Sequence, residues 1–342
     1  MCGSRGADWP SHSPGRPCDG RDCDSQPQHL PAVLQGVRRS YRIPLGLAPT
    51  GKRAVRHGEI GRTRGRQYSQ RVSEVESVST SMTLEAFSRP QAVFGVGKLH
   101  HLPTSCSRQR LLREAIEIGF RAFDVAPAYG NGLNELEVGK ALKGDRSAVR
   151  ITTKFGIPID LYGERCPSLA YIIRVWRRIF ATNYGAEYSK RVFTAHEMRS
   201  SLEGSLRRLK RDWVDIYLLH EPVTALRADQ LTDLCDTADR LKQEGKIRWW
   251  GVAGPLASVK LVAEALRPDV VQVPLQDVAE FPDRRGKHMI AYNCYTTFRR
   301  SDASGRTDFV SYVKSCLDEL GADIIVTTTR RKLLAAWKGL FE

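Results

Sequence analysis

The sequence lacks any run of roughly 18–20 apolar residues of the kind that a helix needs to span a bilayer, which excludes a helical membrane protein. It also lacks the apolar run near the N-terminus that marks a secretory signal peptide. Its eight cysteines are spread without tight pairs, and Cys18 and Cys23 are not at zinc-site spacing. We therefore expect free thiols, no metal site and a reducing compartment, which predicts a cytoplasmic protein.

Composition and charge are those of an ordinary folded protein. The 342 residues include 53 Lys+Arg and 38 Asp+Glu, a formal net charge of +15, with 41% hydrophobic and 27% charged residues. These fractions exclude collagen, a coiled coil and wholesale disorder. No RNA- or DNA-reading motif is present, so we expect the positive charge to serve an anionic cofactor or substrate rather than a nucleic acid.

The first 81 residues differ from the rest. Residues 1–81 contain 13 Lys+Arg and 7 Asp+Glu, are dense in Gly, Pro, Ser and Arg, and show no helical or strand periodicity. Such a segment buries too little apolar surface to offset the chain entropy that folding removes. We predict a disordered basic extension followed by one domain at 82–342.

Three interpretations of this extension stay open. The run "RTRGRQ" (62–67) favours a nucleic-acid-binding arm. The abundance of Arg and Ser is typical of a transit peptide, although the acidic residues at positions 8–24 argue against one. The third interpretation, which we favour, is that the extension is not a functional part and that Met82 is the natural start.

From residue 92 onward, short β-branched runs alternate with segments of helical spacing. The expected strands are 92–97, 120–126, 149–155, 213–220, 247–253, 269–275, 288–293 and 322–328. About eight strand–helix units in roughly 250 residues predict a (β/α)8 TIM barrel. We expect Asn134 and Glu137 to form a capping box at the start of the second helix. No G-x-G-x-x-G follows the first strand, which argues against a Rossmann site.

One connection is longer than the others. Residues 156–195 lie between the third strand and the third helix and contain "YIIRVWRRIF" (171–180), a candidate basic amphipathic helix. Because strand-to-helix loops form the active face of a barrel, we expect this segment to influence substrate choice.

Four polar residues stand at the ends of consecutive strands. Asp124 ends the second strand, Tyr129 follows it by five residues, Lys154 ends the third strand and His220 ends the fourth. Each alone has an ordinary explanation, such as a turn cap or a solvated charge. Because the carboxyl ends of barrel strands meet at one rim, we expect the four side chains to converge on one site.

These residue types suit proton transfer to an oxygen atom. A Tyr hydroxyl with a pKa of about 10 is a poor acid or base near neutrality, and we expect the Lys154 ammonium to lower the pKa of Tyr129. Asp124 would keep the lysine charged and oriented, while His220 would polarise a substrate carbonyl. A cofactor would supply the hydride.

The motifs around these residues resemble those of the aldo-keto reductase family. "FDVAPAYGNGLNELEVGKAL" (123–142) is similar to the family signature Asp-x-Ala-x-x-Tyr-Gly, and "ITTKFG" (151–156) resembles its strand-three Thr-Lys. "SLRRLKRDWVDIYLLHEP" (205–222) is similar to the segment that ends in His-x-Pro, and "EGKIRWWGVAG" (244–254) to the one that enters strand five. The resemblance covers about 92–340 and includes none of the extension.

This resemblance implies a role for each residue. Tyr129 would be the general acid/base, Lys154 and Asp124 would tune it, and His220 would orient the substrate carbonyl. The family binds NADP(H) across the strand ends, so NADP(H) is the expected cofactor, with NAD(H) as the alternative.

The resemblance also implies residues that bind the cofactor. Gln272 in "VVQVPL" matches the glutamine that holds the nicotinamide amide, and Tyr292 in "IAYNCY" matches the aromatic residue on which the nicotinamide stacks. Ordinary strand packing also explains Tyr292. Ala253 and Gly254 stand where the family usually has Ser-Asn, so two amide-binding side chains are absent.

The segment after the eighth strand, "VTTTRRKLL", departs from the family's usual Pro-Gly-Thr or Pro-Lys-Ser. Thr328 and Thr329 would offer hydroxyl groups to the cofactor, and Arg330 and Arg331 would pair with a 2′-phosphate. Solvated charges at a helix start are the alternative explanation for both arginines.

We therefore predict an NADP(H)-dependent oxidoreductase that interconverts a small carbonyl compound (an aldehyde, ketone or sugar) and its alcohol. The alternative is a nucleotide-binding barrel with little turnover that acts as a sensor or regulatory subunit, which Ala253 and Gly254 favour slightly. We expect a monomer or weak homo-oligomer with no nucleic-acid or membrane partner.

Overall fold

The computed structural model describes residues 89–142, 148–160, 165, 191–222, 226–282, 284–301 and 308–342. The extension at 1–81 lies outside the described residues, as does most of the connection 156–195, including the candidate helix 171–180. The expectations for these segments stay predictions.

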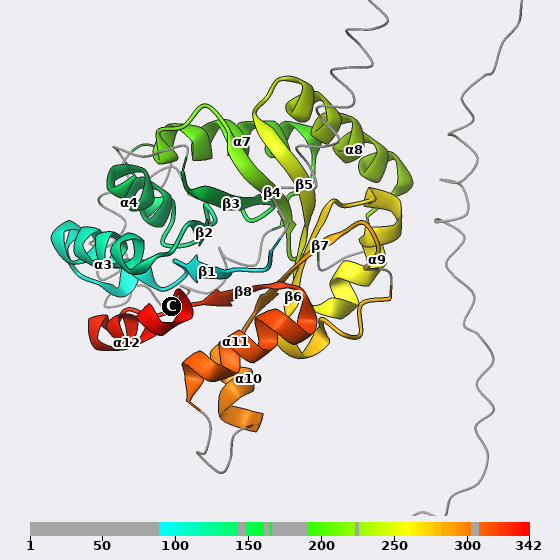
Figure 1. Cartoon of the computed structure of the whole chain (residues 1–342). Helices are drawn as coiled ribbons and strands as arrows, with labels where there is room; N and C mark the ends of the chain where they lie inside the picture. Colours follow the sequence, from blue (N-terminus) through cyan, green and yellow to red (C-terminus); the bar gives the residue numbers. More distant parts are fainter. Residues whose placement is uncertain are drawn as a thin grey trace, which may run out of the picture.

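Eight parallel strands close into a barrel in which each strand pairs with the next along the chain and β8 pairs with β1 (Figure 1). They are β1 (Ala92–Gly95), β2 (Ala122–Asp124), β3 (Arg150–Phe155), β4 (Val214–His220), β5 (Ile247–Ala253), β6 (Val270–Pro274), β7 (His288–Tyr292) and β8 (Asp323–Val326). The predicted (β/α)8 barrel is confirmed, because each β-branched run that the sequence marks forms one strand.

Helices connect the strands and cover the outside of the barrel (Figure 1). They are η1 (Leu99–His101), α3 (Ser105–Ile118), α4 (Leu133–Ala141), α7 (Ala195–Leu209), α8 (Ala228–Gln243), α9 (Leu256–Leu266), η4 (Leu275–Asp277), α10 (Cys294–Ser301), α11 (Phe309–Leu320), α12 (Arg331–Ala336) and η5 (Trp337–Leu340). The sequence did not predict η1 and α10, which are short. Within the described parts of the chain, no helix has the length and hydrophobicity needed to cross a membrane.

The period of two along the strands creates the polar rim. Inward-facing side chains near the amino ends are apolar and form a small core inside the barrel, which includes Ala122, Ile216, Leu218, Val270, Ile290 and Ile325. Continuing the same alternation toward the carboxyl ends reaches Asp124, Lys154, His220, Gln272, Tyr292 and Thr327. The geometry of the sheet therefore turns these polar side chains toward one end of the barrel interior.

A buried charge network holds β3 against the helices outside the barrel. Glu135 of α4 is fully buried and accepts hydrogen bonds from Thr153 Oγ1 and from Arg208 Nε of α7, both at 2.7 Å. Because Thr153 faces outward, its neighbour Lys154 faces inward. The network thus fixes the strand that positions the predicted lysine.

Candidate active site

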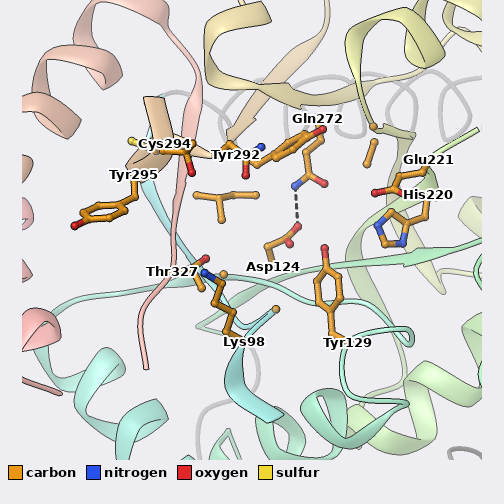
Figure 2. A pocket seen from close by; sticks show the side chains of 17 residues that line it. Lys98, Asp124, Tyr129, His220, Glu221, Gln272, Tyr292, Cys294, Tyr295 and Thr327 are labelled. Atoms are coloured by element: carbon orange, nitrogen blue, oxygen red, sulfur yellow. Dashed lines mark hydrogen bonds between the residues drawn. The ribbon is translucent and has the colours of Figure 1, made fainter. Parts of the chain in front are cut away.

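A pocket of about 270 Å³ opens at the carboxyl ends of the strands (Figure 2). Asp124, Tyr129, His220, Gln272 and Tyr292 all line it. Five residues that the sequence singled out, from β2, β4, β6, β7 and the loop after β2, thus share one cavity.

Asp124 is the centre of a buried hydrogen-bond network under this pocket. Its Oδ1 atom accepts from Lys154 Nζ at 2.6 Å and from Gln272 Nε2 at 2.8 Å. Lys154 also donates to the carbonyl of Val125 at 3.0 Å and is only 1% exposed. The pocket-lining carboxylate therefore fixes the position of the buried amine behind it.

A turn of left-handed residues places Tyr129 over this network. Gly130, Asn131 and Gly132 have φ angles of 66°, 55° and 82°. A Cβ atom at Gly130 would lie 2.5 Å from Cβ of His100, so only glycine fits there. The Gly-Asn-Gly sequence that follows the tyrosine is thus a requirement of the turn.

The predicted capping box at Asn134 and Glu137 is wrong. Gly132 is the N-cap of α4 and makes no side-chain capping bond. Asn134 is fully buried and donates to the carbonyl of Val96 at 2.6 Å, while Glu137 accepts from Ser105 Oγ of α3 at 2.8 Å. Both side chains anchor the start of α4 to neighbouring elements, and this anchoring fixes the turn that carries Tyr129.

The hydroxyl group of Tyr129 points into the pocket between Asp124 and His220 (Figure 2). Its ring meets the His220 ring edge-on, with 5.8 Å between ring centres, and Lys154 Nζ lies 5.1 Å from the centre of the Tyr129 ring. The structure therefore brings together all four side chains that the sequence placed at the strand ends.

Burial decides the protonation state of Tyr129. Loss of solvent raises its pKa well above 10.0, and the negative charges of Asp124 and Glu221 raise it further. The net shift of Tyr129 is thus upward, and the expected lowering of its pKa by Lys154 stays a prediction; burial also lowers the pKa of Lys154, against the opposing effect of Asp124. Tyr129 is a neutral phenol at physiological pH and hence a proton donor.

His220 is neutral for a related reason. Burial lowers its pKa well below 6.5, and the positive charges of Lys154 and Arg191 lower it further. Within the part of the chain that the structure describes, nothing is hydrogen-bonded to its ring nitrogens. A neutral imidazole beside the Tyr129 hydroxyl can donate to, or accept from, a ligand oxygen.

The wall of the pocket at which we expect a cofactor amide to bind contains both polar and apolar residues. Gln272 and Tyr292 line the pocket, and burial raises the pKa of the Tyr292 hydroxyl to about 12. Ala253 and Gly254 also line it and contribute no polar side chain; Gly254 donates its backbone N–H to the carbonyl of Gln272 at 3.0 Å. The aromatic ring and the amide suit a flat heterocycle that carries an amide group.

Among the three threonines after β8, Thr327 lines the pocket. Thr328 faces outward and is 8% exposed, and its Oγ1 accepts from the backbone N–H of Arg330 at 3.0 Å. Thr329 is half-buried and is not part of the lining. The predicted hydroxyl groups were those of Thr328 and Thr329, although the alternation from Ile325 points to Thr327; the cofactor roles of Thr328 and Thr329 stay predictions.

The two arginines differ in their surroundings. Arg331 is exposed and forms an ion pair with Glu114 of α3, with Nε 2.7 Å from the carboxylate. Arg330 is exposed, and its guanidinium has no hydrogen-bond partner among the described residues. Neither lines the pocket, so their pairing with a 2′-phosphate stays a prediction.

Sequence reasoning missed six polar residues that line the pocket, namely Lys98, Glu221, Asn293, Tyr295, Thr296 and Thr327. Lys98 and Thr327 lie on one side of Tyr129, whereas Glu221 lies with His220 on the other side (Figure 2). Lys98 directly follows the first predicted strand and Glu221 directly follows His220, so their positions were the signals available in the sequence. No cluster of three or more His, Cys, Asp or Glu side chains in the described ranges is arranged to bind a metal ion.

The arrangement can protonate an oxygen atom. A ligand oxygen between Tyr129 and His220 would meet a neutral phenol and a neutral imidazole, with a buried ammonium group close to the phenol ring. As charge develops on that oxygen, these groups stabilise it without the reorganisation that bulk water requires.

Comparison with known proteins places this site in a family context. The sequence model of the aldo/keto reductase family matches residues 93–294, more than half of the chain. The L-galactose dehydrogenase of Arabidopsis thaliana is 31% identical over 165 residues, which cover 48% of this chain and 44% of that protein. The uncharacterized oxidoreductase YqkF of Bacillus subtilis is 29% identical over 165 residues and 41% of its length. The matched segment thus spans less than half of these relatives.

Solved structures share the fold. The holo form of an aldo-keto reductase from Bacillus halodurans superposes with a TM-score of 0.55 and 20% identity, covering 74% of this chain and 86% of that chain. A glycerol dehydrogenase from Gluconobacter oxydans superposes with a TM-score of 0.54 and 18% identity, covering 73% and 86%. At these identities the likeness concerns the barrel alone.

Proposed function

Because the chain belongs to the aldo/keto reductase family, we propose that it is an oxidoreductase that interconverts a small carbonyl compound and its alcohol with NADP(H). The observation that carries this proposal is the Tyr129 hydroxyl, which faces the pocket beside Asp124, the carboxylate that accepts a hydrogen bond from the buried Lys154. A neutral proton donor over a buried cation suits protonation of a carbonyl oxygen that gains negative charge.

In the direction of reduction, the substrate carbonyl oxygen binds between Tyr129 and His220. The neutral imidazole of His220 donates a hydrogen bond to this oxygen and orients the carbonyl. Tyr129 donates its phenolic proton to the same oxygen, and its raised pKa keeps that proton in place until the oxygen becomes strongly basic. In oxidation, the phenolate would take the proton back from the alcohol.

Lys154 and Asp124 act on Tyr129 rather than on the substrate. When the phenolic proton leaves, the ammonium of Lys154 stabilises the phenolate, since its nitrogen lies 5.1 Å from the ring centre. Asp124 opposes the loss of the lysine proton through its 2.6 Å hydrogen bond. The pair thus lowers the cost of an anionic tyrosine in a buried site.

The residues of the pocket fit a nicotinamide cofactor. The half-exposed ring of Tyr292 offers a stacking surface, the amide of Gln272 offers a hydrogen-bonding partner, and Arg330 presents a guanidinium beyond the pocket. When bound, NADPH would supply a hydride to the carbonyl carbon. NAD(H) is the alternative cofactor.

The test is oxidation of NADPH by the full chain against a panel of aldehydes, ketones and aldoses. The account predicts turnover with at least one carbonyl compound and a loss of about 10²–10⁴-fold in kcat when Tyr129→Phe removes the proton donor. Tyr312→Phe, a tyrosine on the outer helix α11, is the matched control and should retain full activity.

A second function is favoured by Ala253 and Gly254, which leave one wall of the pocket without polar side chains. A barrel that binds the nucleotide but turns over little would act as a sensor or regulatory subunit. Quenching of protein fluorescence by NADPH, with no turnover of any carbonyl in the panel, would favour this second function.

The cellular compartment, the partner and the oligomeric state are further parts of this proposal. The described cysteines Cys106, Cys235, Cys294 and Cys316 are free thiols, which suits a reducing compartment such as the cytoplasm. A small-molecule substrate is the expected partner, and the expected state is a monomer or weak homo-oligomer. Sedimentation of the purified chain would test the latter.

A further inference from the structure

Glu221 is an acidic residue of the pocket that the mechanism above does not use. It directly follows His220 and lines the pocket, and its carboxylate points inward from the side opposite Lys98 (Figure 2). Its side chain is 41% exposed, so a ligand in the pocket can reach it.

The carboxylate of Glu221 is held in one orientation. Its Oε2 atom accepts a hydrogen bond of 2.8 Å from Arg191 Nη2, whereas Oε1 has no partner among the described residues. The backbone is left-handed, with a φ angle of 50°, and the Glu221 N–H donates to the carbonyl of Ala253 at 2.7 Å. A rigid acceptor with one vacant oxygen therefore faces the cavity.

The backbone of Glu221 also passes close to the adjacent wall. A Cβ atom at Gly254 would lie 3.3 Å from Cα of Glu221, so a larger residue at 254 would press on this turn. Glycine at position 254 therefore leaves room for the left-handed backbone of Glu221, which directs the carboxylate into the pocket.

The surrounding wall offers acceptors to a ligand. Gln272 uses its Nε2 atom to donate to Asp124, which leaves its Oε1 atom without a partner in the part of the chain described. Ala253 and Gly254 add no polar side chain. The guanidinium of Arg191 forms an ion pair with Glu221 through Oε2 and leaves Oε1 as an acceptor, while Lys98 stands on the far side of Tyr129 (Figure 2). A ligand group that fits against these two acceptor oxygens is a hydrogen-bond donor.

We propose that Glu221 is a specificity-determining residue, which selects neutral carbonyl compounds that carry a hydroxyl group next to the carbonyl and rejects those that carry a carboxylate. This inference rests on the proposed carbonyl reductase function. The hydroxyl donates to Oε1 of Glu221 while the carbonyl oxygen lies between Tyr129 and His220. A substrate carboxylate in the same place has no hydrogen to donate and would meet the Oε1 atom oxygen to oxygen, since Arg191 pairs with Oε2 on the other side of the group.

The experiment compares three aldehydes with the full chain and NADPH: propanal, glyceraldehyde and succinate semialdehyde. Hydrogen bonds to a charged group are strong enough to change kcat/KM by about ten-fold or more. We expect Glu221→Leu to lower kcat/KM for glyceraldehyde by this factor and to change that for propanal by less than about three-fold. Glu221→Gln keeps an acceptor oxygen but removes the charge. It should therefore retain kcat/KM for glyceraldehyde and raise kcat/KM for succinate semialdehyde.

Glu280→Gln, at an exposed acid outside the pocket lining, is the matched control and should leave all three values unchanged. An equal loss for all three aldehydes in both Glu221 variants would overturn the inference, because it would mean that the residue only supports the fold. The inference would also be overturned if the ratios of kcat/KM among the three aldehydes were the same in the Glu221 variants as in the unmodified chain. Failure of the unmodified chain to oxidise NADPH with any aldehyde would instead overturn the proposed function, and this inference with it.

Discussion

The ammonium group of Lys154 lies 5.1 Å from the centre of the Tyr129 ring while it donates a 2.6 Å hydrogen bond to Asp124. Lys154 and Asp124 are buried and Tyr129 is partly buried, so solvent screens their charges only weakly and a change of charge at one is felt at the others. This coupling makes the protonation of Tyr129 depend on two residues that need not touch the substrate.

The first prediction concerns the stability of the buried pair. Lys154→Met should lower the free energy of unfolding by about 3–5 kcal/mol, because it leaves the carboxylate of Asp124 buried without its cation. Adding Asp124→Asn to this variant should recover most of the lost free energy of unfolding, because it removes the unpaired charge. Denaturant unfolding of the single and double variants measures the coupling between the two side chains.

An exposed ion pair provides the control. Arg199 and Glu244 are each 38% exposed and lie 2.8 Å apart. Arg199→Met should change the free energy of unfolding by about 0–1 kcal/mol, since solvent screens such a pair. Equal effects of the Lys154 and Arg199 variants would contradict the view that the pair with Asp124 is a buried one.

The second prediction concerns the pH dependence of reduction. The pKa of His220 is lowered well below 6.5, so the imidazole stays neutral as pH falls through that value, and the pKa of Tyr129 is raised well above 10.0, so the phenol stays protonated as pH rises to it. We expect kcat/KM for the carbonyl to be level between pH 6.5 and pH 10.0. A descending limb near pH 8 would show that Tyr129 loses its proton early and would contradict this assignment.

The lowered pKa of His220 also makes the stability of the fold depend on pH. Because the folded pKa of His220 is depressed, the unfolded chain binds more protons below pH 6.5, and stability should fall as pH drops through this range. His220→Gln should flatten that part of the curve. Denaturant midpoints for both proteins at several pH values between about 4 and 7 provide the measurement.

The sequence predicts the barrel and the four strand-end residues because both follow from regular patterns. β-branched runs separated by helical spacing have few alternatives to parallel strands, and a polar residue that ends an inward-facing row must reach the rim, as Asp124 and His220 do. For Asp124, Lys154 and His220 the inference needs only the period of two along a strand, whereas Tyr129 lies in the turn after β2. These inferences do not depend on the detailed packing of side chains.

The parts that sequence reasoning missed depend on tertiary contacts. Asn134 looks like a helix cap, but the approach of Val96 gives its amide a buried partner at 2.6 Å. The pKa of Tyr129 depends on how completely the barrel excludes water, which no spacing reveals. Thr327 is the exception, since the alternation from Ile325 already indicated that it faces inward.

The third prediction concerns the choice between NADPH and NADH. Arg330→Ala should weaken NADPH binding about ten-fold and leave NADH binding unchanged, because its guanidinium is exposed and has no partner in the described residues. Arg331→Ala should have a smaller effect, since Glu114 already occupies that guanidinium. Titration of both cofactors by fluorescence tests this, and equal losses for the two cofactors would contradict it.

The fourth prediction concerns residues 1–81. Their composition cannot build a core, so a chain that starts at Met82 should fold and bind NADPH as the full chain does. Thermal unfolding of both chains gives the comparison. A drop in Tm of several degrees, on the order of 1 kcal/mol, would show that the extension packs on the barrel.

The most direct test of the central claim follows the hydride itself. NADPH that carries deuterium at its transferable position is incubated with the full chain and a carbonyl substrate, and the alcohol is examined for the label. The account predicts deuterium on the carbon that bears the new hydroxyl group, formed about 10²–10⁴-fold more slowly by Tyr129→Phe. An alcohol without label, or equal rates for Tyr129→Phe and the unmodified chain, would contradict it.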